Sequence, residues 1–245
     1  MVVVAHISDL HFNGTRINRA RVESTLGYVN AHADEIDALL ITGDIADEGG
    51  ESEYAEALRV LVSPLPTLIT VGNHDIRERF SSVMLGVKSS APVNWAQLVD
   101  GVLLMVLDSS IPGRNEGYLS DDTLAWASDQ IAAAGPDVPV LLAFHHPPVT
   151  LGMPFMDSIR LTGPERLAEL VDRHPGIIGF LCGHAHSPTV TEFAGRPVCV
   201  APGVASTLNL PFEGHDIVNR GQPPGIAFHI IDDRRMITHF RAVMF

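Results

Sequence analysis

Short apolar runs rich in β-branched residues constrain this chain more than any other feature, and they alternate with segments of helical pattern. Such runs are typical of buried strands in a sheet that is covered on both faces. Their alternation with helices predicts an α/β fold. Six of these runs lie in the first three quarters of the chain, at residues 2–8, 38–42, 67–71, 102–107, 140–144 and 177–182.

The helices between these strands are indicated by apolar spacing and by capping residues. Apolar side chains recur at helical spacing in residues 22–33, which predicts a helix that covers the sheet with one face. Ser120 is placed to cap another helix, which Gly135 can end. Thr162 and Glu165 have the spacing of a capping box, which predicts a third helix after them.

The pattern changes after residue 182, where strands follow one another without helices. They are expected at residues 189–193, 197–201, 225–231 and 236–243. This succession predicts a second, more antiparallel sheet. Two mixed sheets flanked by helices would form a four-layer αββα sandwich. With 245 residues and no linker or repeat, the chain is expected to be a single domain, residues 1–245.

The charge of the chain restricts its partners. Its formal net charge is −13, from 29 acidic and 16 basic residues, so no general attraction to nucleic acid or to an anionic membrane is expected. An anionic substrate would then have to be attracted locally, and bound divalent cations could supply that attraction. Alternatively, the acidity only aids solubility.

Cysteine usage and the N-terminal segment point to a reducing compartment. Cys182 and Cys199 both fall in apolar stretches, which excludes a disulfide framework and a cysteine-rich zinc site. The N-terminus lacks the basic region of a signal peptide, and no run of about 18 apolar residues could span a bilayer. We therefore expect a cytoplasmic protein.

Residues able to bind metal ions directly follow the predicted strands. One such Asp-x-His or His-x-His pair is more often a solvated turn, but the carboxyl ends of strands in an α/β sheet meet at one crevice. Five clusters at strand ends therefore favour one shared site. They are Asp9 with His11; Asp44; Asn73 with His74 and Asp75; His145 with His146; and His184 with His186.

The order D-x-H, G-D, G-N-H-D, H-H-P-P, G-H-x-H resembles the calcineurin-like metallophosphoesterase superfamily over residues 3–186. The segments HISDLHF, FHHPP with Met156-Asp157, and PPG at residues 223–225 are similar to its bacterial class III branch of cyclic-nucleotide and glycerophosphodiester phosphodiesterases. The resemblance implies the metallophosphatase fold and hydrolysis of small phosphodiesters. It ranks 3′,5′-cyclic nucleotides first and glycerophosphodiesters second.

The resemblance also implies two divalent transition-metal ions per chain, held by two ligand sets that share Asp44 as a bridge. A hydroxide between the ions would attack phosphorus. Mixed oxygen and imidazole donors suit Fe, Mn, Zn or Co, and Fe and Mn are the expected metals. The first set is Asp9, His11 and His186, and the second is Asn73, His145 and His184.

Other polar residues near these motifs have two interpretations each. His74 is placed to donate a hydrogen bond to the phosphoryl group or a proton to the leaving group. Asp75 would orient His74 or cap a helix, and His146 would contact the phosphate or pack beneath the site. Arg77 and Arg79 would steer phosphate or lie on an exposed helix face. The remaining histidines are expected to be structural or solvated: His6, His32, His174, His215, His229 and His239.

Two other functions compete with a diesterase. The same metal chemistry would serve a phosphomonoesterase or a protein phosphatase, although no protein-docking insertion is evident. A scaffold that keeps this fold without catalysis, as in a retromer subunit, usually lacks some ligands, whereas every ligand position is filled here. Residues 147–161 include Met153, Phe155 and Met156, which fits a lid over the centre or a contact with a second subunit of a homodimer.

Overall fold

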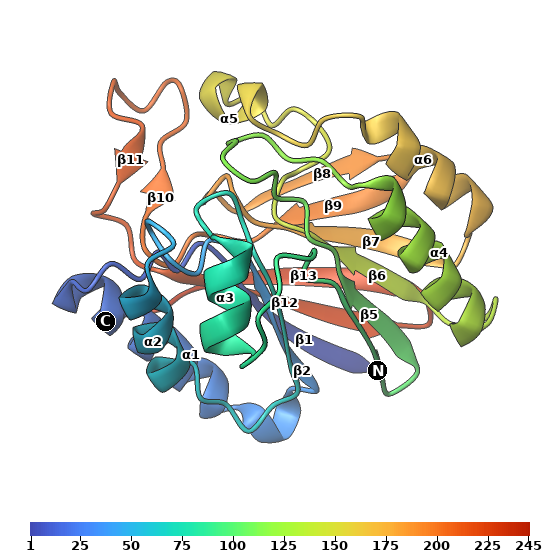
Figure 1. The fold of residues 1–245 in the computed structure, drawn as a ribbon, viewed down its shortest axis with the longest axis horizontal. Helices are drawn as coiled ribbons and strands as arrows, with labels where there is room; N and C mark the ends of the chain where they lie inside the picture. The colour runs from blue at the N-terminus through green and yellow to red at the C-terminus, as the bar shows by residue number, and fades with distance from the viewer.

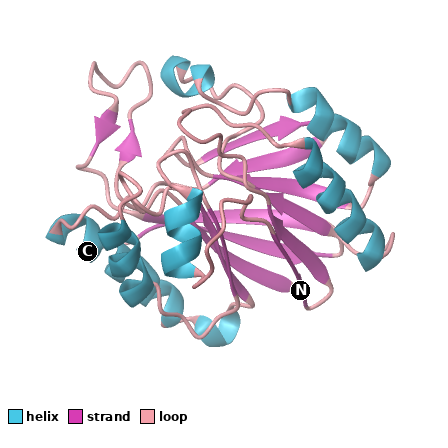
Figure 2. Cartoon of the chain, in the orientation of Figure 1, coloured by secondary structure: helices cyan, strands magenta, loops and turns pink.

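The structure, a computed structural model that describes residues 1–245, contains two large sheets with helices on their outer sides (Figure 1, Figure 2). The first sheet has the strand order β13 (Arg235–Ala242), β12 (Gly225–Asp232), β1 (Val2–Ile7), β2 (Ala38–Thr42) and β3 (Thr67–Thr70). The second has the order β4 (Trp95–Val99), β5 (Val102–Val106), β6 (Val140–Ala143), β7 (Ile177–Cys182), β9 (Arg196–Val200) and β8 (Thr189–Phe193). A separate small hairpin pairs β10 (Thr207–Leu208) with β11 (Val218–Asn219).

The helices are divided between the two outer faces. The first sheet is covered by α1 (Arg16–Asn30), the short 3-10 helix η1 (Ala33–Glu35), α2 (Glu51–Val60) and α3 (Arg77–Met84), and the second by α4 (Asp121–Ala134), α5 (Pro154–Ser158) and α6 (Pro164–Arg173). One apolar core lies under each helical layer, and a third, which includes Val4 and Leu104, joins the two sheets. The predicted four-layer αββα sandwich is confirmed.

The predicted division of the C-terminal strands is wrong. They do not form a sheet of their own: β8 and β9 extend the second sheet beside β7, whereas β12 and β13 extend the first sheet beside β1. The apolar pattern identifies these strands correctly but contains no information about their partners. The pattern also missed β4, the β10–β11 hairpin and the helices α2 and α5, whereas α3 is the helix that was one of the two interpretations of the residues after Asn73.

Two helix caps predicted from the sequence can be compared with those in the structure. Ser120 Oγ accepts a hydrogen bond from Thr123 N at the start of α4, and Gly135 ends that helix with a φ of 100°, as predicted. The capping box at α6 is wrong, because Gly163, with a φ of 62°, occupies the N-cap position. The Thr162 hydroxyl instead donates to the carbonyl of Gly117, so it anchors the preceding loop.

The topology gathers the strand ends at one edge of the molecule. β1, β2 and β3 are parallel in the first sheet, and β5, β6 and β7 are parallel in the second. Their carboxyl ends are joined there by loop contacts such as the bridge between Ser8 and Gly203. The loops after these strands therefore meet, as the sequence predicts. None of the helices is long and apolar enough to cross a bilayer.

Candidate metal centre

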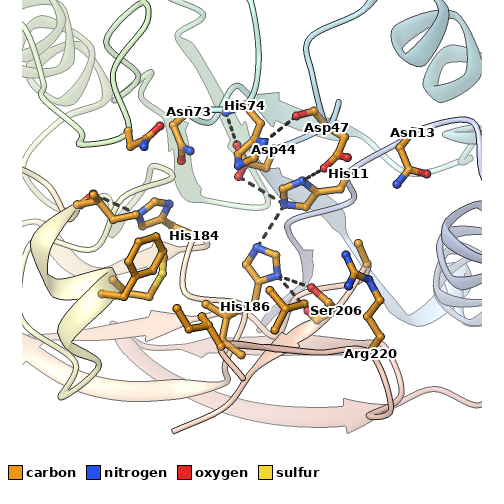
Figure 3. Close-up of a pocket in the computed structure, with 18 of the residues that line it drawn as sticks. His11, Asn13, Asp44, Asp47, Asn73, His74, His184, His186, Ser206 and Arg220 are labelled. Atoms are coloured by element: carbon orange, nitrogen blue, oxygen red, sulfur yellow. Dashed lines mark hydrogen bonds and ion pairs between the residues drawn. The ribbon is translucent and has the colours of Figure 1, made fainter. Parts of the chain in front are cut away.

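Side chains from five strand-end loops converge around Asp44, and Figure 3 shows those of them that line the pocket. Asp44 follows β2, and its Oδ2 lies 3.6 Å from His11 Nε2 and 3.3 Å from His145 Nε2. His11 follows β1 in the first sheet, and His145 follows β6 in the second. One carboxylate oxygen thus faces ligand candidates from both sheets.

The first group lies on the β1 side of Asp44. His186 Nε2 is 3.4 Å from Asp9 Oδ1 and 3.3 Å from His11 Nε2. The other oxygen of Asp9, Oδ2, is buried and has no hydrogen-bond partner. A buried carboxylate oxygen without a donor is costly unless a cation or a proton satisfies it. These three side chains and Asp44 fit a divalent cation.

The second group lies on the β6 side. His145 Nε2 is 3.2 Å from Asn73 Oδ1 and 3.2 Å from His184 Nδ1. Asn73 follows β3 and His184 follows β7, so both sheets contribute. With Asp44 these side chains offer two oxygens and two imidazole nitrogens, a donor set suited to divalent transition metals. The two groups together fit a dimetal site.

The nitrogen of each of these histidines that faces away from the centre is hydrogen-bonded to a protein acceptor. Such contacts fix the tautomer and aim the free nitrogen at a metal. Three of the acceptors are backbone carbonyls and one is a carboxylate. The pairs are His11 Nδ1 with Asp47 Oδ1 at 2.9 Å, His145 Nδ1 with Thr42 O at 2.6 Å, His184 Nε2 with Ile159 O at 3.1 Å, and His186 Nδ1 with Ser206 O at 3.0 Å.

The backbone at the centre is held in an unusual conformation. The left-handed region, which non-glycine residues seldom adopt, contains Asp9, His11, Asp44, His184 and His186, with φ between 42° and 69°. The glycines beside them allow close packing: a Cβ on Gly72 would lie 2.2 Å from Asp44 Oδ1. The G-D, G-N and G-H pairs of the sequence therefore have a steric cause as well as a chemical one.

The charges at the centre are strongly coupled. Burial opposes ionisation of Asp44, but the neighbouring His145 and His11 outweigh it and hold the pKa of Asp44 well below its usual value. Burial likewise disfavours a charged His145, yet Asp44 raises its pKa to about 9. A proton therefore competes with a cation for this imidazole, so metal loading should release a proton and be favoured at higher pH.

His74 lies beside the first group without joining it. Its ring packs edge-on against that of His11, with 4.7 Å between centroids, and its Nδ1 is 2.7 Å from the backbone carbonyl of Asp47. The His74 amide donates to Asp44 Oδ1 at 2.9 Å. His74 Nδ1 is thus occupied by the protein, while Nε2 remains available in the exposed pocket that Figure 3 shows.

For four of the residues with two interpretations, the contacts favour a structural role over contact with substrate. Asp75 does not orient His74, nor does it cap a helix: it is buried and accepts from the amides of Ile45, Ala46 and Gly72 and from the hydroxyl of Tyr54. Burial, with a smaller effect of Asp44, raises the pKa of Asp75 to about 6. Its carboxyl group therefore shapes the loop that presents Asp44.

Arg77, Arg79 and His146 also have structural partners. The Arg77 guanidinium pairs with Asp108 at 2.7 Å, and Arg79 donates to the carbonyl of Gly49. His146 is fully buried; its Nδ1 is 2.8 Å from Ser109 Oγ and its Nε2 is 3.1 Å from the carbonyl oxygen of Asn115. None of the three lines the pocket over the centre.

His6 and His229 form a second buried histidine cluster, between the two sheets. His6 Nδ1 is 3.1 Å from His229 Nε2, and His6 Nε2 is 2.8 Å from the Thr42 hydroxyl. His229 Nδ1 is 2.9 Å from the Thr238 hydroxyl. Burial lowers the pKa of His6 well below its usual value and that of His229 to about 3, so both are neutral and structural, as expected.

A pocket of about 350 Å³ opens above the centre, and residues 147–161 form part of its wall. Phe155, Met156 and Ile159 line the pocket, and the Ile159 carbonyl also supports His184.

The acceptors that hold the outer nitrogens of the candidate ligand histidines were not predicted from the sequence. Asp47 could have been identified, because it is an acidic residue in the loop that carries Asp44. Ile159 and Ser206 act through backbone carbonyls, which every residue has, so their residue types do not indicate this role.

Comparison with known proteins gives consistent matches. The model of the calcineurin-like phosphoesterase family matches residues 2–188. A probable cyclic nucleotide phosphodiesterase from Rhodococcus erythropolis is 34% identical over 223 residues, covering 86% of this chain and 73% of that protein. The glycerophosphodiester phosphodiesterase GpdQ of Enterobacter lignolyticus is 30% identical over 242 residues, covering 93% and 86%. A dimetal phosphatase from Danio rerio has the same fold, with a TM-score of 0.70, 15% identity and coverage of 98% and 96%.

Proposed function

Because the chain belongs to the calcineurin-like phosphoesterase family, we propose that it hydrolyses small phosphodiesters at a centre of two divalent metal ions. The observation that carries this proposal is the position of Asp44 Oδ2, within 3.6 Å of imidazole nitrogens from both ligand groups. Of the possible diesters, 3′,5′-cyclic nucleotides are proposed first, because the Rhodococcus relative that matches 86% of the chain is named a probable cyclic nucleotide phosphodiesterase.

The proposed ligands are the two groups described above, with Asp44 shared by both. The unpartnered Asp9 Oδ2 supports a cation in the first group. The hydrogen bonds that occupy the outer nitrogen of every ligand histidine support metal binding through the inner one. The sets are Asp9, His11, Asp44 and His186, and Asp44, Asn73, His145 and His184.

Two ions held there would lower the pKa of a bound water and offset the charge that develops on the phosphoryl group. His74 is proposed as the catalytic side chain of the protein itself. Its Nδ1–H is directed to the Asp47 carbonyl, so a protonated His74 can direct its Nε2–H at a phosphoryl oxygen or at the departing alkoxide. Because the Asp47 carbonyl fixes the ring, this donor is oriented before substrate arrives.

For the metals we propose Mn or Fe, with Zn or Co as alternatives, because the ligands combine carboxylate and amide oxygens with imidazole. For the compartment we propose the cytoplasm. Cys182 and Cys199 are both free and buried, which accords with a reducing environment.

Glycerophosphodiesters are the second candidate substrates, supported by the 30% identity to the Enterobacter glycerophosphodiester phosphodiesterase over 93% of this chain. A phosphomonoesterase would use the same centre on a dianionic substrate. A scaffold without catalysis would keep the fold and turn over neither class.

A hydrolysis panel separates these functions. Cyclic AMP, cyclic GMP, glycerophosphodiesters and the matching monoesters would be offered to protein loaded with Mn, Fe, Co or Zn, with Asp44→Ala as the inactive control. We expect diesters to be cleaved faster than monoesters and cyclic nucleotides to rank first. Faster monoester cleavage would favour a phosphatase, and no turnover with both ions bound would favour a scaffold.

A further inference from the structure

Arg220 is the one lysine or arginine among the residues that line the pocket above the metal centre. It follows β11 directly, at the end of the small hairpin labelled β10 and β11 in Figure 1. In Figure 3 its side chain extends from the hairpin toward the side of the pocket where His11, His186 and Asn13 lie. The pocket therefore has a cationic group at one side of its metal-binding floor.

The Arg220 guanidinium has no partner within the protein. It forms no ion pair and no hydrogen bond, whereas Arg77 pairs with Asp108 and Arg166 pairs with Asp121. The acidic residues lining the same pocket, Asp44 and Asp47, are engaged with histidines. Its charge is consequently free to act on whatever enters the pocket.

The backbone that presents Arg220 is anchored. The buried Arg21 of α1 donates to the carbonyls of Val204 and Gln222, at 2.7 and 2.9 Å, and so fixes both ends of the hairpin segment. Next to Arg220, the Asn219 side chain accepts from the amide of Gly221. The direction in which Arg220 leaves the backbone is thus set by the fold.

Apolar side chains complete the pocket around this charge. Ile217 and Val218 of the hairpin face the same space as Phe155 of α5, and all three are close to half exposed. Phe155 and Ile217 also line a neighbouring cavity of about 220 Å³, so the groove continues outward between α5 and the hairpin. Such a wall suits a flat, neutral group, and a guanidinium beside it can stack on an aromatic ring or donate to its acceptors.

We propose that this groove holds the organic substituent of the diester and that Arg220 is a specificity-determining residue, which accepts a neutral aromatic substituent and repels a cationic one. The proposal rests on the proposed phosphodiesterase function and narrows it. The nucleoside of a cyclic nucleotide, which carries both ester oxygens, is neutral, whereas the choline or ethanolamine group of a common glycerophosphodiester is cationic. A like charge in the pocket discriminates by repulsion.

Three diesters with one shared leaving group test this idea, because they differ only in the other arm: thymidine 5′-(p-nitrophenyl phosphate), p-nitrophenyl phosphorylcholine and bis(p-nitrophenyl) phosphate. They would be assayed with metal-loaded wild type, Arg220→Gln, Arg220→Glu and Arg220→Lys. Arg235→Gln is the matched control, since the Arg235 side chain is exposed and forms no ion pair or hydrogen bond, and the residue begins β13, away from the pocket.

The quantity compared is kcat/KM for the choline diester divided by that for the thymidine diester. Arg220→Glu should raise this ratio at least about tenfold, Arg220→Gln should raise it less, and Arg220→Lys and Arg235→Gln should leave it near the wild-type value. The gain should shrink in high salt. General damage to the fold would lower turnover of every substrate and could not raise the rate for one arm.

The outcomes separate the inference from its premise. If wild type cleaves all three diesters and the ratio is unchanged in folded Arg220→Glu, the specificity role of Arg220 is wrong while the diesterase function stands. If metal-loaded wild type cleaves none of them, the proposed function fails and this inference fails with it.

Discussion

Two groups of buried histidines in this chain use the same side chain in opposite ways. At the candidate metal centre each histidine proposed as a ligand has one ring nitrogen bonded to a protein acceptor. Its other ring nitrogen faces the carboxylate of Asp9 or Asp44 or a neighbouring candidate ligand. Between the sheets, His6 and His229 bond to each other and to two threonine hydroxyls, and neither forms an ion pair. A nitrogen that faces only other candidate ligands distinguishes a candidate ligand from a structural histidine.

His146 shows how useful that distinction is. It lies next to His145 in sequence and its ring centroid is 4.5 Å from that of His184, so proximity alone would make it a ligand. Both of its nitrogens, however, have protein partners in Ser109 and Asn115. Burial lowers its pKa well below the usual value, which keeps it neutral. By its contacts it belongs with His6 and His229.

The largest expected effect comes from Asp44→Ala, which removes the carboxylate shared by both ligand groups. We expect the purified variant to retain less than one ion per chain, against two in wild type, and to lose activity by more than the roughly 100-fold that loss of a supporting contact can cost. Metal analysis and diester turnover measure this. If Asp44→Ala retained two ions per chain, the assignment of Asp44 as the ligand shared by both groups would be wrong.

His74→Ala should come next, because it removes a proposed donor and leaves every proposed ligand in place. Turnover of substrates with ribose or alkyl leaving groups should fall about 10²–10⁴-fold while both ions remain bound. The loss should be small for p-nitrophenolate, which departs without a proton. Equal losses for both leaving groups would point instead to hydrogen bonding with phosphoryl oxygens, and an unchanged rate would exclude His74 from catalysis.

A smaller effect is expected from Asp47→Ala, which removes the acceptor for His11 Nδ1. Affinity for one of the two ions should fall about 10- to 100-fold, as measured by competition with a chelator. Asp47→Asn keeps an acceptor oxygen and should restore much of the affinity. His146→Gln should leave the affinity for both ions unchanged. A loss of metal from this variant would contradict the assignment of His146 to the structural histidines.

The structural histidines should be detected through the pH dependence of stability. Burial lowers the pKa of His229 to about 3, so below the unfolded value of about 6.5 the unfolded chain binds a proton that the native chain does not. The contribution of neutral His229 is therefore present above pH 6.5 and is lost as pH falls toward 3, at about 1.4 kcal/mol per pH unit.

Urea unfolding of wild type and His229→Gln at pH 7.5 and pH 5 measures this loss. The difference in unfolding free energy between the two proteins should shift with pH in the stated direction. A pH-independent difference would contradict the assignment of His229 as a neutral buried group.

The convergence of the proposed ligands could be predicted from the sequence because their positions follow two simple regularities. Each lies within a few residues after a buried strand, and each belongs to a residue type with metal-binding chemistry, as with Asp9 after β1 and His184 after β7. Most of the acceptors that orient the candidate ligand histidines could not be predicted, because Thr42, Ile159 and Ser206 act through carbonyl groups that every residue has. Arg220 was not identified from the sequence either, because the hairpin that presents it has no recognisable strand pattern.

The sheet to which each late strand belongs could not be predicted either. β9 and β12 are similar apolar runs, yet one lies beside β7 and the other beside β1. Partner choice depends on which strand edges remain open after the rest of the chain has folded, and that is a property of the whole structure. Local caps were predicted where the side chain acts on its own helix, as at Ser120, and not where it bonds elsewhere, as at Thr162.

The left-handed backbone of the ligand residues implies a conflict between activity and stability. Each such residue costs roughly 1–2 kcal/mol relative to an ordinary conformation, and the strained ones here are Asp9, His11, Asp44, His184 and His186. Together they oppose folding by an amount on the order of the 5–15 kcal/mol net stability of a typical protein. Glycine would relieve this strain at any of them, and it would also remove a proposed ligand. Stability and metal binding therefore place opposite demands on the same five positions.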